Sequence, residues 1–147
     1  EGSSNRSQEQ LFCYEHLGLN HGDRPQSIAG FGLNNMAMIE SELRSVLGEL
    51  CRLPSQGLSS NIKRHIIDDI KVLSYTTDII ALHHAMAKYW WAGKRGDRSV
   101  AIREKRAVQN LGRKLNKTII KWGTLDENSN ALDRAGLRVP YKKITGE

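Results

Sequence analysis

The residues best suited to chemistry in this sequence are basic, and they gather between Lys94 and Lys121. That segment holds ten basic residues against Asp97 and Glu104, a charge of 10 − 2 = +8, whereas the whole chain carries +6. The remaining residues therefore sum to 6 − 8 = −2. A positive charge concentrated in one segment favours polyanionic partners such as nucleic acid, acidic peptides or anionic membranes.

Arginine and lysine side chains along a helix suit contacts to phosphates, which position a nucleic acid without reading its sequence. Surface helices usually mix both signs of charge, and this segment barely does. We therefore predict a nucleic-acid-binding site; the alternative is a helix whose charges are merely solvated. The predicted site residues are Trp91, Lys94, Arg95, Arg98, Arg103, Arg106, Arg113, Lys114, Lys117 and Lys121.

Two adjacent tryptophans, Trp90 and Trp91, precede the basic segment. Neighbouring residues on a helix point about 100° apart, so at most one of these rings lies fully in the core. We place Trp90 nearer the core and Trp91 at its rim, where Trp91 stacks on a base or anchors an interface. The alternative is that both rings cover the edge of the core against the next helix.

Patterns for metal binding and catalysis are weak. Cys13, His16 and His21 supply three metal donors, but no fourth ligand and no paired-cysteine motif accompanies them. His65 and Asp69 are four residues apart, which predicts a hydrogen bond on a helix surface. Because no acid, base and nucleophile converge, we predict neither an enzyme nor a cofactor or metal site.

Composition indicates one soluble domain. The chain has 147 residues, 39% of them hydrophobic and 26% charged, which is long enough for a core without metal or disulfide. No apolar run approaches membrane-spanning length and no signal peptide is visible, so we expect an intracellular protein, nuclear or cytoplasmic. Cys13 and Cys51 are predicted to be buried free thiols, with a disulfide between them as the alternative.

Hydrophobic periodicity predicts an all-α fold, a compact bundle of four to five main helices. Residues 1–6 form a flexible lead-in, residues 7–137 a single helical domain and residues 138–147 an extended tail. Within the domain, a short helix near Ser7 is followed by a long loop. Asn34 or Asn35 caps the next helix, which ends before Pro54.

The middle of the chain leaves one question open. A serine at position 59 or 60 caps a helix, and the hydroxyl-rich stretch 74–77 either divides it into two helices or lies inside one long, bent helix from Ser60 to Trp91. A turn containing glycine ends this part of the chain.

A basic helix is predicted next, capped by Asp97 or Ser99 and reaching from about Val100 to Lys121. Its apolar seam comprises Val108, Leu111, Leu115, Ile119 and Trp122. Thr124 opens a capping box for a further short helix, which fades at Gly136.

One stretch, "LSYTTDIIALHHAMAKYW…AVQNLGRKLNKTIIKW", resembles the later helices of the N-terminal domain of transcription elongation factor S-II and related integrase-binding-type domains. The similarity covers about Ile39 to Trp122, and "LCRLPS" resembles the Leu-Pro that ends an earlier helix of that family. This chain lacks the family's short "GIG" turn and inserts "AGKRGDRS". The resemblance implies an interaction module of the transcription machinery that grips short peptide motifs. No functional residue is carried over from it.

Together these features predict a non-enzymatic helical module that binds nucleic acid, RNA rather than DNA, through the basic helix and the turn before it. The alternative is a protein-interaction adaptor of the transcription or ribonucleoprotein machinery that receives an acidic or amphipathic peptide between helices. Salt separates the two hypotheses, because nucleic-acid binding weakens steeply as salt rises whereas a peptide groove tolerates it.

Overall fold

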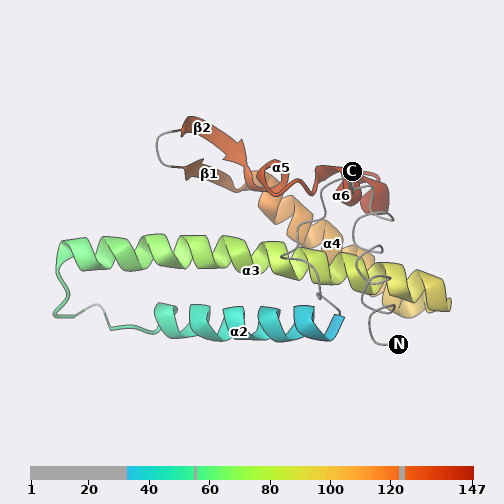
Figure 1. Cartoon of the computed structure of the whole chain (residues 1–147), viewed down its shortest axis with the longest axis horizontal. Coiled ribbons are helices and arrows are strands. Elements are labelled where there is room, and N and C mark those ends of the chain that lie inside the picture. The colour runs from blue at the N-terminus through green and yellow to red at the C-terminus, as the bar shows by residue number, and fades with distance from the viewer. Residues whose placement is uncertain (1–32, 55, 123–124) are drawn as a thin grey trace, which may run out of the picture.

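The computed structural model describes residues 33–54, 56–122 and 125–147. Its helices are α2 (Leu33–Cys51), α3 (Ser60–Arg95), α4 (Arg98–Lys117), α5 (Ala131–Arg134) and α6 (Arg138–Thr145). Figure 1 shows that the long helix α3 runs through the molecule with α2 antiparallel on one side and α4 on the other. The predicted all-α class is confirmed, with a short β-hairpin added to the helices of the described residues.

Helix α2 ends at Cys51, before Pro54 as predicted, and begins at Leu33, slightly earlier than the predicted asparagine caps. Cys51 is a free thiol as expected, but it is exposed rather than buried because it occupies the last turn of α2. The predicted helix near Ser7, the loop after it and Cys13 lie outside the described residues.

The open question about the middle of the chain is answered by α3, a single helix of 36 residues. Its hydroxyl-rich stretch does not break it, because Thr76 and Thr77 donate hydrogen bonds to the carbonyls of Val72 and Leu73, at 2.9 and 2.7 Å. This back-bonding satisfies both hydroxyls inside the helix. Ser59 caps the start of α3, and Gly96 ends it in the left-handed region, at a φ of 71°.

Helix α4 is capped by Asp97, whose side chain accepts a hydrogen bond from the Val100 amide, as predicted. It ends at Lys117, so the predicted continuation to Lys121 is wrong. The β-branched run from Thr118 to Ile120 favours extended backbone and starts strand β1 (Ile119–Trp122) instead. Ile119, placed in the helical seam by the sequence, is mostly exposed.

Strand β1 pairs antiparallel with β2 (Leu125–Asn130), with Ile119 opposite Asn130. The short helix predicted to start at Thr124 is therefore wrong over 125–130, where the chain is a strand. Helix α5 begins only after the hairpin, with Asn130 as its cap: the Asn130 side chain accepts hydrogen bonds from the amides of Leu132 and Asp133.

The predicted extended tail is also wrong, because residues 138–145 form α6. Pro140 lies in the first turn of this helix, where a missing amide donor is tolerated. Pro140, Tyr141 and Ile144 are buried against the rest of the fold. Glycine at position 112 of α4 permits this packing, since a Cβ there would lie 2.0 Å from the Tyr141 ring.

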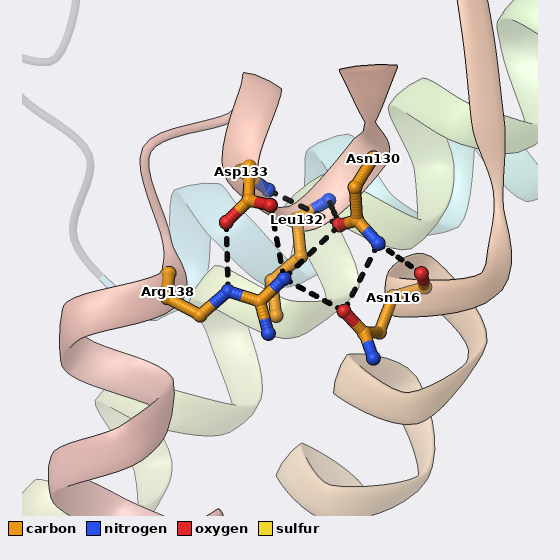
Figure 2. Close-up of polar contacts among 5 residues, drawn as sticks. All are labelled: Asn116, Asn130, Leu132, Asp133 and Arg138. Carbon is orange, nitrogen blue, oxygen red and sulfur yellow. Dashed lines mark hydrogen bonds and ion pairs between the residues drawn. The ribbon is translucent and has the colours of Figure 1, made fainter. Parts of the chain in front are cut away.

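A polar cluster joins the end of α4 to the hairpin, α5 and α6 (Figure 2). Arg138 donates to Asp133 Oδ1 at 2.7 Å and to Asn116 Oδ1 at 2.7 Å. Asn130 donates to Asn116 Oδ1 at 2.9 Å and to the Asn116 carbonyl. The hydrogen bonds from Arg138 lower the pKa of Asp133, so its carboxylate stays ionised.

The hydrophobic core lies between α3, α4 and the C-terminal elements. Its fully buried side chains come from α3, α4, α5 and the segment leading into α6, and they include Leu82, Met86, Val108, Leu115, Leu132 and Leu137. The end of α4 and the C-terminal elements are thereby fixed relative to each other, which holds the basic helix in place.

Candidate nucleic-acid interface

The outward face of α4 carries a continuous stripe of polar and basic side chains, which we call the outer stripe. Its members follow one another at spacings of 4, 3, 4, 3 and 4 residues, so they share one side of the helix. Each of the six is exposed. The outer stripe consists of Ser99, Arg103, Arg106, Asn110, Arg113 and Lys117.

The one carboxylate of α4 is turned away from this stripe. Glu104 is 4% exposed and faces α3, where its Oε2 lies 3.4 Å from Lys88 Nζ. Arg103 reaches back to the other oxygen of Glu104 at 3.3 Å. Burial of Glu104 leaves the solvent-facing side of α4 with cations and no carboxylate of its own.

Two of the predicted site residues are partly neutralised by carboxylates from other parts of the chain. Lys114 Nζ lies 2.7 Å from Asp78 of α3. Arg113 donates two hydrogen bonds to Glu147, one of them from Nε at 3.1 Å, and Tyr141 donates a third to that carboxylate at 2.6 Å. The hydrogen bonds from Arg113 and then Tyr141 lower the pKa of Glu147.

Arg106 and Lys117 are the stripe cations best placed to meet a ligand. Neither forms an ion pair with any residue in the part of the chain that the structure describes, and both are exposed. The same holds for Arg95 and Arg98 at the α3–α4 turn. These four residues, together with Lys94, are exposed predicted site residues that form no ion pair with another described residue.

The tryptophans lie at the C-terminal end of α3, beside this turn. Trp90 and Trp91 are both half-buried and meet edge to face, with ring centroids 4.9 Å apart and planes at 84°. Lys94 Nζ sits 5.1 Å from the centroid of the Trp90 ring, a cation–π geometry. The aromatic partner of Lys94 is therefore Trp90, whereas the sequence placed Trp91 beside it.

The site residues thus fall into two groups. Arg98, Arg103, Arg106, Arg113, Lys114 and Lys117 lie on α4, and Trp91, Lys94 and Arg95 lie on the last turns of α3. Lys121 lies on β1, beyond the end of α4, so it does not continue the row. Ser99 and Asn110 were not predicted as site residues; extending the 3–4 periodicity of the apolar seam to the opposite face would have found them.

A groove lies between α3, the end of α4 and β1. This groove has a volume of about 830 Å³. Its apolar lining includes Val72, Tyr75, Leu115 and Ile120, and its charged lining is Asp68, Lys71 and the Asp78–Lys114 pair. Burial raises the pKa of the Tyr75 hydroxyl.

A metal-binding constellation does not appear among the described residues. No group of three or more His, Cys, Asp or Glu side chains there could hold a metal ion, and the Cys13, His16 and His21 pattern lies outside the described part. The hydrogen bond predicted between His65 and Asp69 is not formed. His84 instead bonds Glu40 of α2 through Nδ1 at 2.7 Å, and burial lowers the pKa of His83 to about 4.

The described helices contain no stretch apolar enough, over sufficient length, to cross a membrane. Comparisons with protein-family models, with curated protein sequences and with solved structures give no match for this chain. The resemblance to the S-II N-terminal domain therefore stays a prediction.

Proposed function

We propose that this protein is a non-enzymatic module that binds nucleic acid, RNA rather than DNA, along the outer stripe of α4 and the adjoining α3–α4 turn. The observation that carries the proposal is the orientation of α4: its single carboxylate, Glu104, is buried, and the opposite side presents exposed arginines and lysines. Such a face attracts phosphates and has no carboxylate of its own to repel them.

The dimensions of the face suit several phosphates at once. The stripe spans 19 residues from Ser99 to Lys117, and the rise between these two ends is about 27 Å along a helix. Arg106 and Lys117 contact phosphates directly, while Arg113 exchanges its contact with Glu147 for one with the ligand. Asn110, midway along the stripe, offers an amide that donates and accepts hydrogen bonds at a base edge.

The α3–α4 turn adds the aromatic part of the interface. Trp90 and Trp91 are half-buried beside Lys94 and Arg95, so their partly exposed rings can stack with unpaired bases. Stacking of this kind requires bases that are not held in a duplex, which is why we favour a single-stranded ligand.

Salt dependence tests the proposal directly. If about five phosphates of a single strand are neutralised, the binding constant falls about 100-fold between 50 and 200 mM salt. The probe is a labelled 20-nucleotide oligouridylate, followed by fluorescence anisotropy. Absence of binding at 50 mM salt, or binding that salt leaves unchanged, contradicts the proposal.

Charge reversal locates the site. Arg106→Glu with Lys117→Glu is expected to weaken oligouridylate binding by more than about tenfold and to flatten its salt dependence by about two phosphate contacts. The matched control is Lys142→Glu with Lys143→Glu, which makes the same change of charge on α6. Equal losses in both double variants would mean that overall charge, rather than α4, drives binding.

The groove between α3 and β1 favours a second candidate function, an adaptor that receives an acidic or amphipathic peptide. Its apolar lining suits leucine-like side chains, and Lys71 at its edge suits an acidic flank. Selection of amphipathic acidic peptides from a displayed library tests this candidate. Binding that resists salt and is lost in Tyr75→Ala supports the adaptor, whereas binding lost in the α4 double variant assigns the peptide to the basic face.

A further inference from the structure

The N-terminal part of α3 extends past the end of α2. Figure 1 shows this end of α3 continuing beyond α2, with the connecting chain returning to it. We call residues Ser60–Val72 the α3 extension. None of its residues is buried, and only Ile66 and Ile70 are even half-buried. The hydrophobic core begins further along the helix, at Leu82.

The α3 extension nevertheless carries an apolar stripe. Ile62, Ile66 and Ile70 follow at spacings of four residues, so they lie on one side of the helix. Ile62 and the neighbouring Ile67 are 48% and 52% exposed. An amphipathic helix buries such a stripe against another element, and a segment of this length is only marginally stable alone in water.

Charge along the extension is ordered in two blocks. Lys63 and Arg64 come first, and Asp68 and Asp69 follow one turn later. The two cations stand near the positive end of the helix dipole, and the first turn of α3 holds no acidic residue to offset it. None of these four side chains forms an ion pair with another described residue.

We propose that the α3 extension binds the same segment of a second copy of the chain, antiparallel, with Ile66 near the two-fold axis. In this arrangement Lys63 and Arg64 approach the partner's Asp69 and the partner's Asp68, and the isoleucine stripes cover each other. The partner's carboxylates also come close to the positive end of the α3 dipole. A parallel pair would place cations against cations and carboxylates against carboxylates.

The contact is small. Thirteen residues of helix extend about 20 Å, and two such segments bury an area at the small end of specific interfaces. We therefore expect a weak dimer that forms and dissociates with concentration in the micromolar range. The outer stripe of α4 does not line the groove that Asp68 and Ile70 share with the end of that helix, so dimerisation leaves both outer stripes open.

Sedimentation velocity of the full chain over a range of micromolar concentrations tests the dimer. The wild-type protein is expected to shift from monomer to dimer, and Ile66→Asp to stay monomeric with an unchanged helical circular dichroism spectrum. Val139→Asp is the matched control, because Val139 is 53% exposed on α6. A wild-type chain that is monomeric throughout, or a dimer that Ile66→Asp leaves intact, overturns the proposal.

Charge exchange tests the role of the two charge blocks in the contact. A K63E/R64E chain and a D68K/D69K chain are each expected to remain monomeric, because every contact across the two-fold axis becomes repulsive. Mixed together, they are expected to form a heterodimer, since the blocks are again complementary. Failure of the mixture to associate, with wild type dimerising under the same conditions, contradicts the charge pairing across the contact. Neither result depends on whether α4 binds RNA.

Discussion

Two parts of the molecule share the helix α3 and differ in net charge and in how many hydrophobic residues they bury. The distal part, residues 33–76, has five acidic and five basic residues, so its net charge is 5 − 5 = 0. The core part, residues 77–147, has fifteen basic and seven acidic residues, a net charge of 15 − 7 = +8. Met36 is the one buried hydrophobic residue described in the distal part, whereas the core cluster lies wholly in the core part.

This difference shows that one helix serves two roles. In the core part, α3 contributes Leu82 and Met86 to a packed interior, which fixes α4 and the cationic face it presents. In the distal part, α3 packs on α2 and borders the groove with the end of α4 and β1, and Ile62 and Ile67 stay exposed. We therefore expect stability to come from the core part and association to come from the distal part.

Truncating one buried and one exposed side chain gives the largest contrast. Leu115→Ala removes a fully buried side chain next to α3 and is expected to lower the free energy of unfolding by about 2–5 kcal/mol. Ile67→Ala on the α3 extension is expected to change it by less than about 0.5 kcal/mol in dilute solution. Urea denaturation measures both. Similar losses would mean that the distal part has a core of its own.

Alanine substitutions at two helical glycines are expected to change the free energy of unfolding in opposite directions. Gly112→Ala drives a methyl group into the Tyr141 ring, so we expect a loss of about 1–3 kcal/mol in the free energy of unfolding. Gly93→Ala meets no atom within 4 Å inside α3 and is expected to stabilise by about 0.5–1 kcal/mol. Thermal unfolding of the two variants checks the signs. If Gly112→Ala were neutral, α6 would not be packed on α4 as described.

The helix caps of the two parts differ in how many bonds each side chain makes. Asn130 caps α5 and also bonds Asn116, so Asn130→Ala is expected to cost about 1–2 kcal/mol in unfolding free energy. Ser59 caps α3 through one exposed bond of 3.3 Å, and Ser59→Ala is expected to cost about 0.5 kcal/mol. A larger loss for Ser59→Ala, measured by urea denaturation, would show that the start of α3 is better packed than its exposure indicates.

The smallest expected effect is a local response to pH at the contact between α2 and α3. Burial opposes ionisation of Glu40, yet hydrogen bonds from His84 and Arg44 outweigh it and hold the Glu40 pKa below its ordinary value of 4.5. A lowered pKa stabilises the folded state above about pH 4.5, and this contribution is lost as pH falls through the folded pKa. The protection factors of the α2 amides, which are exchange rates corrected for the intrinsic effect of pH, are therefore expected to fall below pH 4.5.

The matched variant for this effect is Glu40→Gln, in which the α2 amides should have lower protection factors at neutral pH that change little on further acidification. Because Asp133 and Glu147 in the core part also have lowered pKa values, protection must be followed in α2 itself rather than through global unfolding. Protection factors in α2 that are independent of pH in the wild-type chain would contradict the role given to Glu40.

Helix positions in the middle of the chain could be predicted because their caps are local. Ser59 and Asp97 stand directly before periodic apolar residues, and both cap helices in the structure. The sequence could not decide whether α3 is one helix or two. A threonine hydroxyl can cap a new helix or donate to the carbonyl four residues earlier in a continuous one, and tertiary packing selects between these two bonds.

The C-terminal elements could not be predicted, because their conformation depends on distant contacts. Ile119 and Trp122 fit the helical period of α4, yet the pairing of β1 with β2 holds them in a strand. Residues 138–147 were predicted to be an extended tail, but the packing of Tyr141 over Gly112 supports α6. The helix that carries the basic face could be predicted from the sequence. The burial of Glu104 against α3 and the pairing of Arg113 with Glu147 could not, because both depend on how distant parts of the chain pack.

Mapping the RNA contact by nuclear magnetic resonance tests the central claim most directly. Titration of a 20-nucleotide oligouridylate into the 15N-labelled protein at 50 mM salt is expected to shift the amide signals of α4, with the Asn110 side-chain amide among them, and to leave the α3 extension unchanged. Shifts confined to the α3 extension or to the groove, or no shifts at all, would contradict a nucleic-acid interface on α4.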